Sequence, residues 1–272
     1  MLSIIVPASN EEQWIGPCLS ALCTSTLPAA EVIVVANGCR DATVGVARTI
    51  LESELPDGWS AQVLDLATGS KPFALNAGDA AAHFPNRVYL DADVTVSPGL
   101  LAAIADAISD PAPRYASGTP VMPRAKSAVT RAYARFWQKL PFNRTTAPGY
   151  GLFAVNAAGR ARWAEFPSII SDDTFVRLQF VPEERVQVPQ TYLWPMIEGF
   201  SALTRVRRRQ DAGVKELQAL HPGLLSREGK PPLGKVGIMR LAMADPAGFA
   251  IYAAVSVAVR ARKGGTSFTR GR

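Results

Sequence analysis

The chain has 272 residues, 48% of them hydrophobic and 19% charged, with a formal net charge of +6. This is the composition of a folded globular protein, which excludes general disorder, and the length is enough for one large domain with a complete core. The three cysteines, Cys18, Cys23 and Cys39, are odd in number and lack zinc-ligand spacing, so neither a disulfide framework nor a zinc site is expected.

Strands and helices are expected to alternate over the first 110 residues. Short apolar runs predict strands at 2–6, 31–36, 61–66 and 88–90, and apolar residues at helical spacing predict a helix after each one. Asn10 and Ser97 are expected to cap the first and the fourth of these helices. The alternation predicts an α/β fold, with an open and mainly parallel central sheet flanked by helices.

The pattern is less regular after Asp110. A strand is expected around 115–121 and a helix over 125–140, where Tyr133, Phe136 and Trp137 are available for packing or for a substrate surface. Gly149 and Gly151, on either side of Tyr150, either form a plain turn or let the backbone approach a ligand closely. The expected parts of the chain are 1–110, 111–204 (the second half of the same domain), a basic helical region at 205–263 and a disordered tail at 264–272.

Two acidic pairs carry possible chemistry. Asp91 and Asp93 follow a predicted buried strand, and side chains at i and i+2 of an extended chain point the same way. Two such carboxylates at the carboxyl end of a strand suit a divalent cation, although a polar surface turn also contains this pair by chance. Asp172 and Asp173 are expected to begin a helix, where acids stabilise the N-terminus, and a catalytic role would need one of them free to accept a proton.

Positive charge is concentrated in the C-terminal part. From Arg205 onward the sequence has 14 Lys and Arg against 4 Asp and Glu, whereas the preceding part is net negative. Such a segment suits phosphate groups or an anionic membrane surface, although a solvated basic face has the same composition. It carries no nucleic-acid recognition motif, so nucleic acid is not an expected partner.

An uncharged segment at 247–259 is too short to span a bilayer, so it is either a core helix or an interfacial helix. The first predicted strand starts at Leu2 with no leader ahead of it, so a cytoplasmic location is expected, including a peripheral position at the inner face of the membrane.

Taken together in chain order, five motifs resemble those of the family 2 glycosyltransferases, which have the nucleotide-sugar-binding GT-A fold and invert the anomeric centre. The matching stretches are Ile5 to Glu12 (IVPASNEE), Val34 to Thr43 (VVANGCRDAT), Ser70-Lys71 with Ala74 to Gly78 (ALNAG), Leu90 to Asp93 (LDAD), and Asp172-Asp173. The resemblance covers roughly residues 2–180, and the last 60 or so residues match less clearly.

The resemblance implies a set of site residues. The nucleotide sugar would be bound by Pro7, Ala8, Glu11, Asn37, Lys71, Asp91, Arg208 and Arg209. Asp93 and Asp91 would bind Mn²⁺ or Mg²⁺, a hard cation that the donor diphosphate also ligates. Asp173, with Asp172 as the alternative, would deprotonate the acceptor hydroxyl, and Tyr150 and Gly151 would lie on the acceptor side.

The implied partners are a nucleotide-diphosphate sugar donor and a glycan or lipid-linked acceptor of the cell envelope or of an exopolysaccharide. The family usually has an acidic pair after the second strand, whereas this chain has Ala36-Asn37. An asparagine can both donate and accept hydrogen bonds, so a UDP-sugar is only weakly favoured as donor. His221 is a further candidate metal ligand or a plain surface residue.

Two other functions remain open from the sequence. A nucleotidyltransferase of related architecture would carry a glycine-rich loop after the first strand, where this chain has Pro7 to Glu11. A catalytically silent peripheral membrane protein would keep the sheet without using the acidic pairs.

Overall fold

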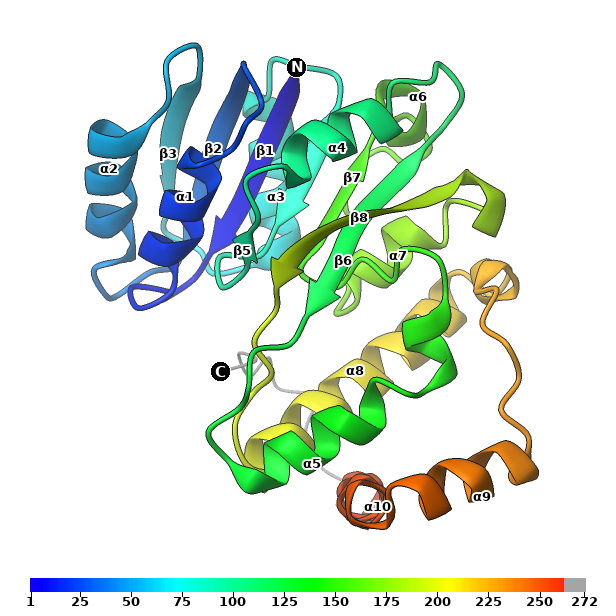
Figure 1. The fold of residues 1–272 in the computed structure, drawn as a ribbon. Coiled ribbons are helices and arrows are strands. Elements are labelled where there is room, and N and C mark those ends of the chain that lie inside the picture. Colours follow the sequence, from blue (N-terminus) through cyan, green and yellow to red (C-terminus); the bar gives the residue numbers. More distant parts are fainter. Residues whose placement is uncertain (262–272) are drawn as a thin grey trace.

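The computed structural model describes residues 1–261 (Figure 1). Eight strands form one sheet in the order β3-β2-β1-β4-β7-β6-β8-β5. The strands are β1 (Leu2–Ala8), β2 (Ala30–Asn37), β3 (Ser60–Leu66), β4 (Arg87–Leu90), β5 (Thr95–Val96), β6 (Tyr115–Val121), β7 (Leu152–Val155) and β8 (Arg185–Leu193). The α/β class expected from the sequence is confirmed.

Ten α-helices connect or follow these strands in the described chain. They are α1 (Ile15–Cys23), α2 (Thr43–Glu54), α3 (Lys71–Ala81), α4 (Leu100–Ala107), α5 (Ala128–Trp137), α6 (Ala157–Arg160), α7 (Asp172–Arg177), α8 (Phe200–Leu220), α9 (Lys235–Ala244) and α10 (Pro246–Ala261). Three short 3-10 helices lie at Pro141–Arg144, Pro182–Glu184 and Leu224–Arg227.

The sheet is mixed. Strands β3, β2, β1 and β4 are parallel, as the strand–helix alternation predicts, whereas β7 is antiparallel to both β4 and β6. Strands β6 and β8 are parallel, and β5 is antiparallel to β8. The parallel half therefore ends at β4, where the strand that bears Asp91 at its carboxyl end borders an antiparallel neighbour.

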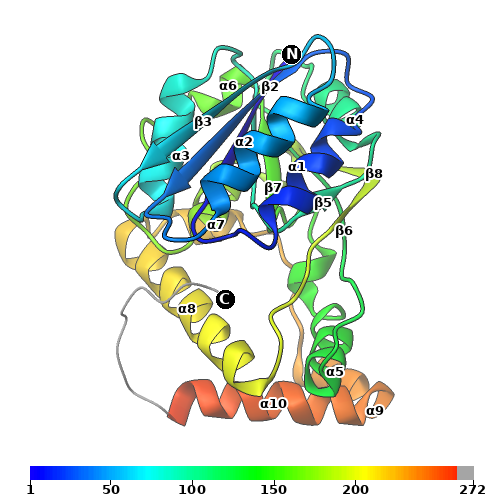
Figure 2. The same ribbon diagram turned by 90° about the vertical axis from the view of Figure 1, so that its left-hand side faces the viewer.

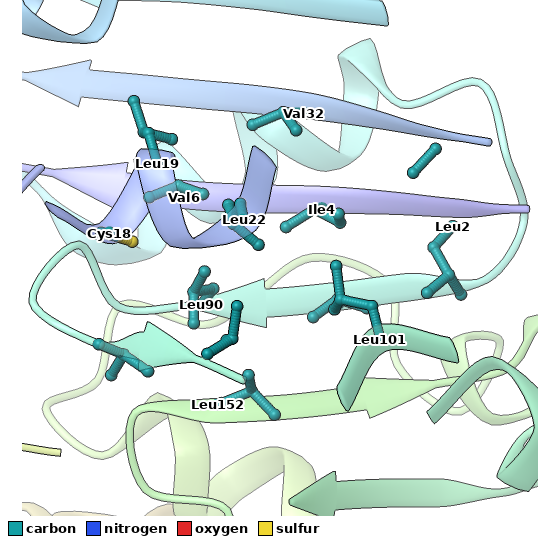
Figure 3. Packing of buried hydrophobic residues seen from close by; sticks show 14 of the residues in the cluster. Leu2, Ile4, Val6, Cys18, Leu19, Leu22, Val32, Leu90, Leu101 and Leu152 are labelled. Atoms are coloured by element: carbon teal, nitrogen blue, oxygen red, sulfur yellow. The ribbon is translucent and has the colours of Figure 1, made fainter. Parts of the chain in front are cut away.

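The sheet is buried on both faces. Alternate residues of β1 point to opposite sides, so Ile4 and Val6 pack with Leu19 and Leu22 of α1, whereas Ile5 packs in a second cluster with Leu75 of α3. Figure 3 shows the first of these clusters beneath α1. Coverage from both sides explains why β1 and β2 are continuous apolar runs rather than alternating ones.

Helices α5, α8, α9 and α10 gather at one end of the molecule, away from the sheet (Figures 1 and 2). Aromatic rings hold α10 against α5: Phe136 contacts Phe249 with ring centroids 5.6 Å apart and Tyr252 at 5.1 Å. Asp245 adds a two-pronged ion pair, because its two oxygens accept from Nε and Nη2 of Arg135, each at 2.8 Å. The segment 247–259 thus packs as a helix of this bundle.

Several predicted helix boundaries are wrong. Asn10 does not cap α1; it has a φ of +54° and its side-chain oxygen accepts from the Arg40 amide at 2.7 Å, which ties two loops together. Helix α4 begins after Gly99 rather than at Ser97. The sequence also predicts a helix from Pro195 that ends before the basic run at 205–210; instead α8 begins at Phe200, after Gly199 with its φ of +89°, and the basic run lies within it. The predicted disordered tail, 264–272, lies outside the described residues.

Candidate active site

A cleft of about 480 Å³ opens at the carboxyl ends of β1, β2 and β4 and extends between α5 and α8. Its donor end, as we call it, is acidic and is lined by Pro7, Ser9, Asn10, Glu11, Asn37, Lys71, Asp91, Asp93, Asp172 and Asp173. Its aromatic end is lined by Tyr133, Trp137, Tyr150, Trp194 and the aliphatic side chains of Met196, Ile197, Leu203 and Val206. Arg207, Arg209 and Gln210 of α8 form a basic wall.

Lys71 joins the two acidic pairs at the donor end. Its Nζ lies 2.8 Å from Oδ1 of Asp91 and 3.0 Å from Oδ2 of Asp172. Lys71 is the first residue of α3, and Ser70 caps that helix by accepting from the Phe73 amide. The fold thus brings together Asp91 and Asp172, which are about 80 positions apart in the sequence.

The carboxylates around Lys71 change the pKa of its ammonium group. Burial by itself would lower the pKa of the Lys71 ammonium, but the carboxylates of Asp172, Asp91 and Asp173 raise it above its ordinary value. Burial raises the pKa of Asp172, the nearby carboxylates of Asp173 and Asp91 raise it further, and the Lys71 ammonium opposes that rise. Lys71 therefore remains charged at neutral pH and neutralises part of the acidic cluster.

Asp172 and Asp173 occupy different environments. The Asp172 side chain is only 8% exposed and points to Lys71. Asp173 is less buried, and its Oδ1 accepts from the Thr174 amide at 2.6 Å. Both residues begin α7, as predicted, but only Asp173 has the exposure that an acceptor hydroxyl would need.

Asn37 is a structural residue in this arrangement. It is 3% exposed, and its amide nitrogen donates to the carbonyl oxygens of Ala8 at 2.9 Å and Val35 at 3.3 Å. Its side-chain oxygen accepts from the Ser70 amide at 3.0 Å. Both polar atoms of Asn37 thus hold β1, β2 and the start of α3 together, so the side chain holds Lys71 in place through its neighbour Ser70.

Some of the remaining residues predicted to bind the donor line the cleft, whereas others are buried behind it. Pro7 and Glu11 line the cleft, whereas Ala8 is buried and contributes a carbonyl oxygen to Asn37. Behind them, burial raises the pKa of the Cys18 thiol, and the carboxylates of Asp93, Asp91 and Glu11 raise it further. Cys18 is therefore an unreactive thiol that lies in the electrostatic field of three acids.

At the aromatic end, three rings from separate segments meet. The rings of Trp137 and Trp194 stack with centroids 5.9 Å apart, and Tyr150 lies 4.7 Å from Trp194 and 5.5 Å from Trp137. Gly151 permits this contact: its φ is +77°, and a Cβ there would lie 2.6 Å from Cδ1 of Trp194. The sequence singled out Tyr150, Gly151 and Trp137 but not Trp194, which directly follows β8 and is positioned by the pairing of β8 with β6, where its amide donates to the carbonyl oxygen of Val121.

The three consecutive arginines of α8 point in different directions. Arg209 lines the cleft and so does Arg207, whose Nε donates to Asp211 at 2.8 Å. Arg208 instead donates to the carbonyl oxygen of Ala258 in α10 at 3.3 Å, since successive residues of a helix are turned by about 100°. His221 lies at the end of α8 against Phe175, with ring centroids 5.3 Å apart, rather than among the cleft residues.

The carboxylates of the cleft are the side chains that could ligate a divalent cation. Within residues 1–261 there is no group of three or more His, Cys, Asp or Glu that could hold a metal ion. Asp91 and Asp93 nevertheless present carboxylates to one cleft, and oxygen ligands suit Mg²⁺ and Mn²⁺. These two residues fit an ion that takes its other ligands from a bound diphosphate, whereas they would not form a site complete in itself.

Three solved structures of similar fold, each from a different organism, illustrate the likeness. A mannosyltransferase from Pyrobaculum calidifontis, in complex with GDP-Man and Mn²⁺, is 20% identical, with a TM-score of 0.63 over 97% of this chain and 76% of that one. S. aureus TarS 1-349 with UDP-GlcNAc is 14% identical, with a TM-score of 0.55 over 96% and 91%. Glucosyl-3-phosphoglycerate synthase from Mycobacterium tuberculosis, with Mn²⁺ and UDP, is 19% identical, with a TM-score of 0.56 over 86% and 82%.

At these identities the likeness shows the fold, which is that of the GT-A glycosyltransferases. A sequence comparison with curated proteins gives no match. The model of the glycosyl transferase family 2 matches residues 3–165, which is more than half of the chain. The matched part contains every strand of the sheet except β8. The chain therefore belongs to glycosyl transferase family 2.

Proposed function

We propose that the protein transfers a sugar from a nucleotide-diphosphate sugar to an acceptor hydroxyl in a single inverting displacement. The observation that carries this proposal is the convergence of Asp91, Asp93, Asp172 and Asp173 on one cleft, with Lys71 between the two pairs. Similar folds whose structures hold GDP-Man, UDP-GlcNAc or UDP support a nucleotide-sugar donor.

The donor lies at the acidic end in this proposal. Pro7 and Glu11 border the nucleotide, and the Lys71 ammonium and the Arg209 guanidinium flank the diphosphate. Asp93 and Asp91 would hold Mn²⁺ or Mg²⁺, which when bound would offset the charge that develops on the leaving diphosphate. Because Arg208 faces α10, we assign it no diphosphate role; Arg209 keeps the role predicted for it, and Arg207 joins it.

Asp173 is the general base. As the acceptor oxygen bonds to the anomeric carbon, the bond from that carbon to the diphosphate oxygen breaks, the acceptor proton passes to Asp173, and the nucleoside diphosphate leaves. One displacement with one base inverts the anomeric configuration. Asp172 does not take the proton; its carboxylate holds Lys71 at the donor end.

The aromatic end receives the acceptor. Trp137, Tyr150 and Trp194 offer ring faces, and Met196, Ile197 and Leu203 add aliphatic surface beside them. Such a surface suits an acceptor that carries an apolar group next to its sugar, which favours the lipid-linked acceptor over a free glycan.

A thermal-shift panel tests the donor. The protein, freed of metal by chelation, is heated with UDP-, GDP-, dTDP- or CDP-sugars, each with and without Mn²⁺. We expect one nucleotide to raise the melting temperature when Mn²⁺ is present, and Asp93→Asn to remove that increase. If no sugar nucleotide stabilises the protein with Mn²⁺ present, the proposal fails.

A further inference from the structure

Helix α9 presents apolar side chains to solvent. Considered within residues 1–261, it has no buried residue. Val236, Met239 and Met243 are 58%, 58% and 69% exposed, and their spacing of three and four residues places them on one face of the helix. A contiguous apolar stripe of this kind on the surface usually marks a contact with something outside the protein.

The stripe, defined as these three residues, lies at an outer edge of the molecule. Figure 2 shows α9 and α10 following one another along the end that is farthest from the sheet. Helix α10 has an exposed uncharged face of its own, with Ala250, Ala254 and Val257 spaced to share it, before Arg260. Two consecutive helices thus leave uncharged faces uncovered at the same end of the protein.

The charges around these faces are of one sign. Lys230, Lys235, Arg240 and Arg260 are all exposed, and the only acid in the sequence between 229 and 261 is Asp245. Asp245 is buried and already paired with Arg135 and Lys139. The accessible charge of the segment is therefore positive.

We propose that α9, together with the exposed face of α10, lies on an anionic lipid surface. Apolar side chains flanked by Lys and Arg are the composition of a helix that lies in the interface, with its apolar face at the acyl chains and its cations at the head groups. A second copy of this chain would bring like charges together. No helix of the described chain is long and apolar enough to cross a membrane, so the contact is peripheral.

The proposed lipid-binding surface lies close to the aromatic end of the cleft. Helix α10 packs on α5 through Tyr252 and Tyr133, whose rings are 5.5 Å apart, and Tyr133 lines the aromatic end. Arg207 of the basic wall donates to the hydroxyl of Tyr252 at 3.1 Å. A lipid surface at α9 and α10 is thus one helix away from the end of the cleft assigned to the acceptor.

Vesicle flotation of the full chain tests the proposal. Vesicles of phosphatidylcholine alone are compared with vesicles that also contain phosphatidylglycerol. We expect flotation with the anionic vesicles only, and a decrease of at least about tenfold in the bound fraction for the triple variant Val236→Gln, Met239→Gln, Met243→Gln. Lys235→Gln with Arg240→Gln should weaken binding and reduce its sensitivity to salt.

A matched control replaces three exposed apolar residues elsewhere, Val181→Gln, Val214→Gln and Leu220→Gln, and should float like the unmodified protein. Thermal unfolding of every variant verifies the fold, and the donor thermal shift is measured in parallel, so loss of membrane binding is distinguishable from loss of donor binding. The proposal is overturned if the unmodified protein does not bind anionic vesicles, if the triple variant binds them equally well, or if the stripe instead mediates dimers in sedimentation.

Discussion

At the scale of single residues, the donor end assigns different tasks to two neighbouring acids. Asp172 is buried in an ion pair with Lys71, whereas Asp173 is the more exposed of the two. The local sequence pattern places both at the same predicted helix start, and only the family resemblance favoured Asp173 over Asp172 as the base. Their environments make the two substitutions below distinguishable.

Asp173→Asn should lower kcat by about 10²- to 10⁴-fold, because the variant cannot accept the proton of the acceptor hydroxyl. Donor binding should change little, since Asp173 is not placed at the nucleotide. Transfer kinetics and donor affinity measured on the same preparation check this. A variant that transfers at a normal rate would remove Asp173 from the base role.

Asp172→Asn should have a different effect. Lys71 would keep Asp91 but lose its buried partner, so the pKa of the Lys71 ammonium should fall and its position at the diphosphate should loosen. We expect a higher KM for the donor and a smaller decrease in kcat than in Asp173→Asn. The reverse order of the two kcat values would exchange the assigned roles.

At the scale of elements, Asp245 joins the start of α10 to α5 within the helical bundle. Besides pairing with Arg135, it accepts from the Gly248 amide at 3.0 Å and so caps α10. The hydrogen bond from Arg135 holds the pKa of Asp245 well below its usual range, even though burial opposes this.

This predicts a pH dependence of stability. Because the pKa is lower in the folded than in the unfolded protein, whose value is near 3.8, the contribution of Asp245 is complete well above pH 4 and is lost as the pH falls below it. Asp245→Asn should therefore melt at a lower temperature at pH 7 but lose less stability between pH 5 and pH 3. Melting curves over this range measure the difference, and parallel losses in both proteins would contradict the assignment.

The elements also show what the sequence could determine. The β1, β2 and β4 strands and Asp91 at the end of β4 follow from local apolar runs and from alternation, which depend on neighbours along the chain. Trp194 and the engaged side chain of Asn37 depend on which distant segments pair, and no local pattern contains that information. Helix α8 begins only after Gly199, whose φ of +89° no pattern of apolar spacing reveals.

At the scale of the whole molecule, the cleft lies between the sheet, which forms the donor end, and the helical bundle, which forms much of the aromatic end. A change confined to the contact between α5 and α10, away from Arg209 of α8, should therefore act on the acceptor rather than on the donor. Phe249→Ala removes a ring that packs on Phe136 of α5, and should destabilise the protein by about 2 kcal/mol, less than a fully buried ring.

In this variant we expect the KM for the acceptor to increase several-fold while the donor-induced thermal shift stays unchanged. Steady-state kinetics with each substrate varied in turn, below the melting temperature, provide the comparison. Equal effects on both substrates would mean that the two ends of the cleft are not independent.

Lys71 neutralises only part of the negative charge at the donor end of the cleft. Its ammonium pairs with Asp91 and Asp172, and Asp93 and Asp173 line the same end of the cleft, so one cation faces four carboxyl groups before any ligand binds. A nucleotide-diphosphate sugar is itself an anion and would be repelled there unless it arrives with its counter-charge. The species that the protein binds would then be the ion–nucleotide complex, so donor affinity should follow the concentration of that complex rather than the concentration of the sugar nucleotide alone.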